Sequence, residues 1–423
     1  MRGAFLLFLF ALLLFSAAYV QGSHEEFGSV ELVRELTGPR FNHTATLLKD
    51  GCVLIAGGTE DGQASLSSAE IYCPDDRIWL PSGEMLEKRQ RHTADLLPDG
   101  RVLAAGGFNG EGHPSLMKDL SPTGSFSLSS TEIYNSYREA WETGPPLSTG
   151  RFWHRAVVLG DGNIVVIGGI NITEGALASC ELFDVRAFTW KAFPSLNVGR
   201  ARFTAVLLRD GRILVAGGHD GAAKKPYSSC EVYDPALGRW EFTAPMNRAR
   251  GYHAGVLLPD GRYLVSGGFS APDRPDWSDS EVFDPYDGTW TMSGEMSFPR
   301  HNHELVSTGG AYVVVIGGSN CLTGGCHSTM EVFESESMEF RESYLSLLGR
   351  KWSTATMLTD GSVLIAGGRS CGEPTSITEL YVPPAEAEEN YEFWGSDASI
   401  MLVVGAVLLA AVSLLCRAHG GSG

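Results

Sequence analysis

The chain has 423 residues, of which 43% are hydrophobic, and a formal net charge of −18 from 50 acidic and 32 basic side chains. This acidic surplus disfavours nucleic acid and anionic membrane surfaces as partners, because phosphate groups attract lysine and arginine. The composition is compatible with an exported protein.

The N-terminus carries the features of a secretory signal peptide. Arg2 is followed by an apolar run from Ala4 to Val20, and the small residues Ala18 and Gly22 offer two cleavage sites. The sequence therefore predicts a signal peptide over residues 1–22. An uncleaved membrane anchor is the alternative.

Most of the remaining chain is a repeat, which is clearest from Arg250 to Trp290. Its Gly-Gly pair recurs at intervals of 49, 62, 49, 50, 50 and 50 residues. The pairs begin at Gly57, Gly106, Gly168, Gly217, Gly267, Gly317 and Gly367. A period near fifty residues is typical of one four-stranded blade, so seven copies predict an all-β, seven-bladed propeller over residues 28–382.

Each unit contains the signals of four strands. In the second unit, two apolar runs flank Asp99-Gly100, a dipeptide that predicts a hairpin with a type I′ turn. Gly-Gly ends the second strand, where a side chain would obstruct the close approach of another backbone segment. A third β-rich run spans Thr131 to Tyr134, and Trp141 marks the fourth strand.

The seventh unit has no fourth-strand aromatic residue before the C-terminal segment. An unassigned run from Ser29 to Leu36 precedes the first unit, and Val30 lies 13 residues before His43. The fourth-strand tryptophans Trp141 and Trp290 lie at the same distance before the equivalent residues of the following units. We therefore expect the N-terminal strand to complete the last blade and to remove two open sheet edges.

Two charged residues recur in every unit. An arginine precedes each first strand, at Arg40, Arg89, Arg151, Arg200, Arg250, Arg300 and Arg350. A glutamate lies in each third strand, at Glu70, Glu132, Glu181, Glu231, Glu281, Glu331 and Glu379. A requirement shared by all blades favours a structural role, through Arg-to-Glu or Arg-to-carbonyl bonds. The alternative is a cationic ring that binds an acidic ligand.

The residue at the entrance to each first strand differs between blades, and we call these seven positions the entrance residues. They are Asn42, Arg91, Trp153, Arg202, Tyr252, Asn302 and Trp352. The loops between second and third strands emerge on the same face of the propeller as the entrance residues, and we call this the top face. The second unit has an insertion in its loop between these strands. Arginine and aromatic residues are enriched in binding hot spots, so all entrance residues except Asn42 are candidate ligand-binding residues. Plugging of the channel by the bulky side chains is the alternative.

Histidine follows the entrance residue in five units. These histidines are His43, His92, His154, His253 and His303. Symmetry-related points on seven blades are too far apart to coordinate one ion at about 2 Å. We therefore expect packing or hydrogen bonding here, and no metal or other cofactor.

Together, the Gly-Gly, Glu-x-aromatic and fourth-strand aromatic signals resemble those of kelch-repeat proteins from Ser29 to Val382. The Arg-x-x-His and Pro-Asp-Gly forms are most similar to the galactose oxidase and bacterial-type kelch motif. The resemblance implies a propeller that binds other proteins, mostly through its top face.

The same resemblance sets an enzymatic alternative, a copper-radical oxidase. Tyr252-His253 is similar to a Tyr-His pair that ligates copper in galactose oxidase. That family also needs a second entrance tyrosine cross-linked to cysteine, and a histidine from a separate C-terminal domain. Neither is evident in this sequence, so we expect no enzymatic activity.

Cysteine positions predict disulfides. Cys52 opens a second strand and Cys73 closes the adjacent third strand, so antiparallel pairing brings them together. Cys321 and Cys326 share one top loop, and Cys371 occupies the matching position in the next unit. We expect one bridge among these three.

Two N-glycosylation sequons begin at Asn42 and Asn171. Asn171 follows a Gly-Gly pair in a predicted loop and is the better acceptor. Asn42 lies at a strand entrance, where it is more shielded.

The C-terminal segment predicts a single membrane span. An acidic linker over residues 383–397 precedes an uncharged run of 19 residues, 398–416, which as a helix would extend roughly 28 Å. Arg417 begins a short tail over residues 417–423, which the positive-inside rule places in the cytoplasm. A removed glycolipid-anchor signal is the alternative.

The sequence thus indicates a single-pass type I protein of the cell surface or a secretory membrane. We expect its propeller to bind an extracellular or lumenal protein or glycan through the top face. Besides the oxidase alternative, a self-associating adhesive or structural ectodomain remains open.

Overall fold

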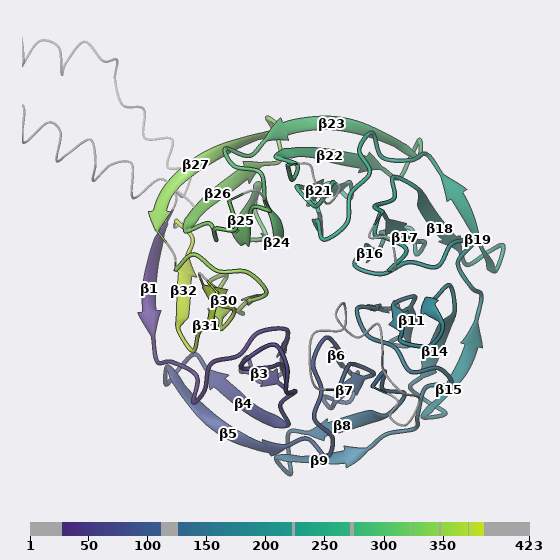
Figure 1. The fold of residues 1–423 in the computed structure, drawn as a ribbon, viewed down its shortest axis with the longest axis vertical. Helices are drawn as coiled ribbons and strands as arrows, with labels where there is room; N and C mark the ends of the chain where they lie inside the picture. Colours follow the sequence, from purple (N-terminus) through teal and green to yellow (C-terminus); the bar gives the residue numbers. More distant parts are fainter. Residues whose placement is uncertain are drawn as a thin grey trace, which may run out of the picture. The chain divides into compact units, whose positions relative to one another are not determined.

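The computed structural model describes residues 28–384 except positions 111–125, 222–224, 271–274, 322, 347 and 371. These residues form seven four-stranded antiparallel sheets, which surround a central axis as the blades of a propeller (Figure 1). The predicted all-β, seven-bladed architecture is confirmed.

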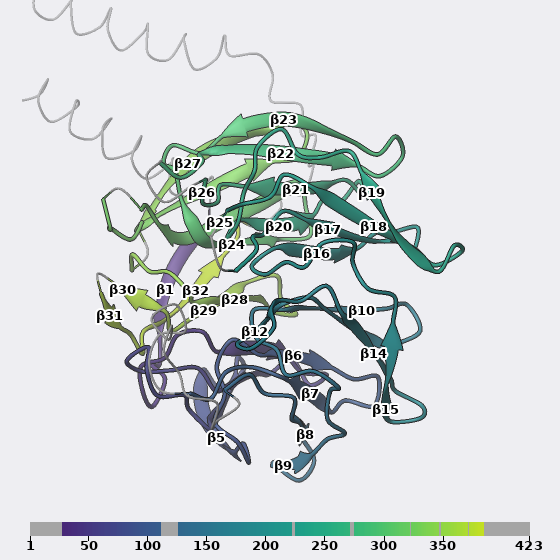
Figure 2. The ribbon, with the colours of Figure 1, turned by 45° about the vertical axis from the view of Figure 1, so that its right-hand side comes forward.

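Each blade runs outward from an inner first strand to an outer fourth strand (Figures 1 and 2). Blade 1 consists of β2(Thr44–Leu47), β3(Val53–Ala56), β4(Ser68–Cys73) and β5(Ile78–Glu84), and blade 2 of β6(Thr93–Leu96), β7(Val102–Ala105), β8(Thr131–Asn135) and β9(Ala140–Thr143). Blade 3 consists of β10(Arg155–Val158), β11(Ile164–Ile167), β14(Cys180–Asp184) and β15(Thr189–Phe193). Blade 4 consists of β16(Thr204–Leu207), β17(Ile213–Ala216), β18(Cys230–Asp234) and β19(Arg239–Thr243). Blade 5 consists of β20(Ala254–Leu257), β21(Tyr263–Ser266), β22(Asp279–Asp284) and β23(Thr289–Glu295). Blade 6 consists of β24(His301–Ser307), β25(Tyr312–Ser319), β26(Thr329–Glu334) and β27(Glu339–Ser346). Blade 7 consists of β28(Thr354–Met357), β29(Val363–Ala366), β32(Thr378–Val382) and β1(Ser29–Val33). Short ribbons in the loops of blades 3 and 7 pair β12(Ile170–Asn171) with β13(Gly175–Ala176) and β30(Arg369–Ser370) with β31(Glu373–Pro374).

The predicted hairpin between the first two strands of blade 2 is present, but its predicted turn type is wrong. Gly100 has a φ of 92°, whereas Asp99 does not have the positive φ that a type I′ turn requires. The Gly100 N–H donates to the Leu97 carbonyl at 2.9 Å, and the Leu97 N–H donates to the Arg101 carbonyl at 2.7 Å. This is a three-residue loop with glycine at the left-handed position. Pro98 and Asp99 fit its two preceding positions, and Asp99 Oδ1 accepts the Arg101 N–H at 3.0 Å.

The Gly-Gly pairs are required by close backbone approach. A Cβ on Gly267 would lie 2.4 Å from the Arg300 carbonyl oxygen. Gly268 has a φ of 102°, and its N–H donates to that same carbonyl at 2.9 Å. The pair therefore ends β21 where the chain entering blade 6 crosses it, as the sequence predicted.

The hydrophobic core lies between adjacent blades. The second strand is completely buried in six blades, and in blade 6 only the first residue of β25, Tyr312, is exposed. Between blades 4 and 5, Leu214 packs in one cluster with Tyr263, Phe283 and Trp290 of the next blade. One sheet alone cannot bury both of its faces, so the ring of blades is itself the unit of stability.

The N-terminal strand closes the ring. β1 pairs with β32 in antiparallel register, with Val30 opposite Tyr381, and lies outermost in blade 7 (Figure 1). In blade 5 the same positions hold Trp290 opposite Phe283. The closure prediction is confirmed, although the strand ends at Val33 and does not extend to Leu36.

The disulfide predicted between Cys52 and Cys73 is present. Cys321 and Cys326 are free thiols, so a bridge between these two is not formed. Both occupy the β25–β26 loop, where Cys326 Sγ contacts the Arg369 carbonyl at 3.4 Å. Cys371 lies outside the described residues.

The predicted signal peptide, membrane segment and cytoplasmic tail also lie outside the described residues, as does the linker after residue 384. In the part of the chain that the structure describes, no helix has the length and apolar character needed to span a membrane.

Candidate functional site

The seven recurrent arginines are buried and pair with the seven glutamates. The pairs are Arg40–Glu70 at 2.7 Å, Arg89–Glu132 at 2.6 Å, Arg151–Glu181 at 2.8 Å, Arg200–Glu231 at 2.7 Å, Arg250–Glu281 at 2.6 Å, Arg300–Glu331 and Arg350–Glu379. Each arginine is at most 2% exposed. Such groups are inaccessible to a ligand at the surface.

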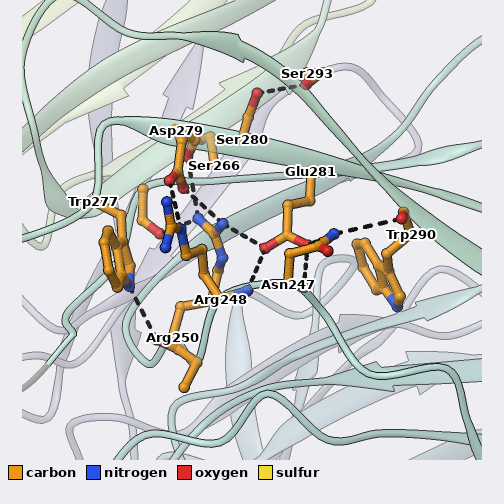
Figure 3. Close-up of polar contacts among 12 residues, drawn as sticks. Asn247, Arg248, Arg250, Ser266, Trp277, Asp279, Ser280, Glu281, Trp290 and Ser293 are labelled. Carbon is orange, nitrogen blue, oxygen red and sulfur yellow. Dashed lines mark hydrogen bonds and ion pairs between the residues drawn. The ribbon is translucent and has the colours of Figure 1, made fainter.

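Blade 5 shows the network in most detail (Figure 3). Arg250 Nη1 donates to the carbonyls of Gly267 at 2.7 Å and Asp279 at 3.1 Å, and Nη2 donates to Asp279 Oδ1 at 2.8 Å. Glu281 also accepts the backbone N–H of Asn247, which lies before the arginine, at 2.6 Å. The network thus ties the segment entering the blade to its second and third strands. Both the Arg-to-Glu and the Arg-to-carbonyl bonds considered from sequence are present in this network, and they support a structural role.

The seven entrance residues line the mouth of a central cavity of about 500 Å³. All seven have left-handed backbones with φ between 53° and 59°, although none is glycine. In six of them the N–H donates to the carbonyl of the equivalent residue in the preceding blade, as from Arg91 to Asn42 at 3.0 Å. A ring of backbone hydrogen bonds therefore fixes the mouth, and the side chains can vary on a rigid frame.

Four consecutive entrance residues form an alternating stack of cations and aromatic rings. The Arg91 guanidinium lies 4.4 Å from the Trp153 ring centroid. Arg202 lies 3.3 Å from the same centroid and 3.9 Å from the centroid of Tyr252. Cation–π contacts of this kind hold a guanidinium in place without neutralising it.

These two arginines have no anionic partner among the described residues. Nε and Nη1 of Arg91 and Nε of Arg202 are buried without a hydrogen-bond acceptor. Burial, reinforced by the charge of Arg202, lowers the pKa of Arg91 well below its usual value. Burial also lowers the pKa of Arg202 to about 10, so it remains charged at neutral pH. The mouth therefore presents two guanidinium groups that retain unused hydrogen-bond donors, an arrangement suited to an anion.

The remaining entrance residues complete the rim. Trp352 stacks on Phe41 at 5.5 Å and lies beneath the Lys351 ammonium. Asn302 and Asn42 line the same cavity, and Asn42 Nδ2 is 3.5 Å from Gln90 Oε1. The structure thus brings all six candidate ligand-binding residues to one mouth.

Two acidic residues in the channel wall were missed by the sequence analysis. Asp95 and Glu304 lie on inner strands β6 and β24 and line the same cavity. Burial raises the pKa of each to about 7. Both residues could have been found from sequence as acidic residues within the apolar run of a first strand, because inner strands otherwise carry few charges.

The five recurrent histidines are hydrogen-bonded between neighbouring blades. His43, His92, His154 and His253 each contact a threonine hydroxyl through Nε2, at 3.0 to 3.2 Å, and His303 contacts Ser266 Oγ at 2.8 Å. Burial lowers the pKa of all five, to about 3 for His43 and His154. The predicted hydrogen bonding is confirmed for these residues.

Replacing His154 with phenylalanine is expected to make the protein less sensitive to acid. The pKa of His154 is below that of an unfolded histidine, so the folded state binds fewer protons and loses stability as pH falls below about 6.5. Its share of the loss between pH 7.5 and pH 5 is about 2 kcal/mol. Phe203 occupies the equivalent position in blade 4 and is fully buried, so phenylalanine is sterically compatible. Urea unfolding at the two pH values measures the difference, and an equal acid loss in both proteins would contradict it.

Tyr252 and His253, the pair similar to copper ligands, are engaged in separate contacts. The Tyr252 ring stacks on His219 at 5.2 Å as well as contacting Arg202. His253 Nε2 lies 3.1 Å from Thr204 Oγ1. The other entrance positions hold no tyrosine.

Asn171 lies in the loop between β11 and β14, as expected, but it belongs to the short strand β12 and is only 8% exposed. Its Nδ2 donates to the Gly150 carbonyl at 2.7 Å, and its Oδ1 accepts the Thr173 N–H at 2.9 Å. The loop folds back as the β12–β13 ribbon, and both polar atoms of the Asn171 side-chain amide are engaged in hydrogen bonds. Asn42 is partly buried in the mouth.

The fold and the repeated network define a kelch-type β-propeller. A family model described as the KLHDC2/KLHL20/DRC7 Kelch-repeats domain matches residues 153–368, and the chain belongs to this kelch-repeat family. Comparison with curated proteins gave no match.

Among solved structures, the chain is similar to a fungal alcohol oxidase of the AA5 family in complex with copper. The two share 16% identity with a TM-score of 0.65, over 85% of this chain and 77% of the oxidase chain. At this identity the likeness shows a shared fold.

Proposed function

We propose that this protein is a non-enzymatic kelch propeller that binds a protein partner at the mouth of its central channel. A carboxylate of the partner would lie against Arg91 and Arg202, beside the Trp153 ring. The observation that carries this proposal is the pair of guanidinium groups at the mouth that have no acidic partner among the described residues. Kelch propellers generally bind proteins, which favours a protein ligand over a glycan.

The structural arginines provide the internal comparison for this proposal. Each of them already has a glutamate partner in its own blade. Arg91 and Arg202 instead contact aromatic rings and open onto the cavity. The first set serves the fold, and the second is available for recognition.

We place the protein at the cell surface or in a secretory membrane. This location rests on the N-terminal signal-peptide pattern, the apolar run at 398–416 and the acidic composition. The binding face would then meet extracellular or lumenal partners.

Removing both mouth cations is expected to abolish tight binding. Peptides selected by the purified protein from a displayed random pool should be acidic. The Arg91→Met/Arg202→Met variant should bind these peptides at least about 10-fold more weakly, because their carboxylates lose both charged partners. Arg138→Met is the matched control, since that side chain is 72% exposed and lies in the outer β8–β9 hairpin. Calorimetric titration measures the affinities. Equal affinity of a folded double variant would contradict the proposal.

A copper oxidase is the second candidate function, favoured by the shared fold with the fungal alcohol oxidase. It predicts copper uptake and substrate-dependent peroxide release by the purified protein. Concentration-dependent sedimentation would instead favour a self-associating ectodomain.

A further inference from the structure

Three potential metal ligands meet on the top face at the boundary between blades 5 and 6. Asp276 belongs to the loop between β21 and β22, His301 begins β24, and Cys321 belongs to the loop between β25 and β26. They are 25 and 20 residues apart in sequence, and the ring of blades brings them together.

The ligand atoms of these residues all lie within 4.8 Å of one another. His301 Nδ1 is 2.8 Å from Asp276 Oδ2 and 3.7 Å from Cys321 Sγ. Ligands at about 2.0–2.3 Å from a tetrahedral ion are separated by roughly 3.4 Å. The observed separations therefore need only small adjustments to enclose an ion.

Asp276 carries the second observation that points to a ligand. Its side chain is completely buried, and Oδ1 has no hydrogen-bond partner among the described residues. Its Oδ2 already accepts the Cys321 N–H at 2.7 Å. A buried carboxylate oxygen without a donor is costly unless a cation is bound nearby.

The histidine is specific to this blade boundary. The position held by His301 is occupied in the other blades by Phe41, Gln90, Phe152, Ala201, Gly251 and Lys351. The fold therefore does not require histidine at this position, and the recurrent histidines lie two residues later in the chain. His301 departs from the repeat and lies beside two other potential metal ligands. A local metal site explains this better than a requirement of the fold.

We infer that Asp276, His301 and Cys321 form a site for a divalent transition metal of the zinc class. Nitrogen, thiolate and carboxylate ligands suit zinc. Binding requires the Cys321 thiolate and a His301 tautomer protonated at Nε2, so one proton, from the thiol, passes to water for each ion bound. Ser319 Oγ lies 3.3 Å from His301 Nε2 and can accept a hydrogen bond from its N–H, as an outer-shell partner does.

Three protein ligands leave a fourth position for water or an exogenous group. The His301 ring makes an edge contact with Tyr252 at 6.1 Å, so the site adjoins the mouth. The ion would also join the top loops of blades 5 and 6.

Cobalt and zinc titrations of the metal-stripped full-length protein test this site. Cobalt should give thiolate-to-metal charge-transfer absorption at one equivalent, and zinc should displace it. Cys321→Ser should lose the absorption and bind zinc at least about 10-fold more weakly. Cys326→Ser is the matched control, because this thiol shares the loop but contacts the Arg369 carbonyl, and it should behave as wild type.

Asp276→Asn is the second variant, with thermal melting used to verify folding. It should weaken zinc binding while retaining the charge-transfer band of any cobalt bound. The inference is overturned if wild-type protein binds cobalt without a thiolate band, if Cys321→Ser binds zinc with unchanged affinity, or if thiol counting finds Cys321 oxidised in a disulfide.

Discussion

Replacing Arg250 with methionine is expected to lower the free energy of unfolding by about 3–5 kcal/mol, because it leaves buried carboxylates without their cation. Both Asp279 and Glu281 contact this guanidinium, and the arginine and Glu281 side chains are completely buried. The Gly267 carbonyl loses its donor as well. Urea unfolding followed by tryptophan fluorescence measures the change.

Asp279→Ser provides the matched control. Blades 1 to 4 carry serine at this position, at Ser68, Ser130, Ser179 and Ser229, and each accepts a hydrogen bond from the arginine of its blade. The control keeps the Arg250–Glu281 pair and loses only one acidic side chain, so we expect a much smaller loss than for Arg250→Met. A methionine variant within about 1 kcal/mol of wild type, with unchanged denaturant dependence, would show that the buried pair is dispensable.

Deleting residues 28–33 is expected to open the ring. The deletion removes β1 and its five register pairs with β32. Roughly five ladder hydrogen bonds at about 0.5–1.5 kcal/mol each imply a loss of about 3–7 kcal/mol. The exposed edge of β32 should also promote association between chains. Denaturant unfolding and analytical ultracentrifugation measure the two effects.

Leu32→Ser tests whether closure depends on strand pairing or on side-chain hydrophobicity. Leu32 is 76% exposed, so this variant keeps the strand and should remain monomeric with wild-type stability. If the deletion variant also remained monomeric and unfolded at the wild-type denaturant concentration, closure by β1 would contribute nothing to stability.

The fold could be predicted from sequence because every blade repeats the same physical requirements. Gly267 and Gly268 are needed where backbones cross, and Arg250 and Glu281 are needed where a blade entrance is tied to its third strand. Seven occurrences of each requirement define the blade number. The type of hairpin turn was missed because Asp-Gly is compatible with more than one loop length.

The functional site was only partly predictable. Sequence comparison between blades found the entrance positions, since the repeat register defines them. It could not show that Arg91 and Arg202 share the Trp153 ring, because this depends on side-chain packing across three blades. The Asp276, His301 and Cys321 cluster was missed for a similar reason, since its members come from three separate elements.

The central claim is that the partner binds at the mouth between blades 2 and 5. Photocrosslinking from benzoylphenylalanine in place of Trp153 tests this most directly, with the same substitution at Tyr137, an 86% exposed residue in the outer β8–β9 hairpin, as control. We predict that a selected acidic peptide crosslinks from position 153 and not from position 137. Crosslinking from position 137 alone, with none from a folded protein substituted at 153, would contradict the claim.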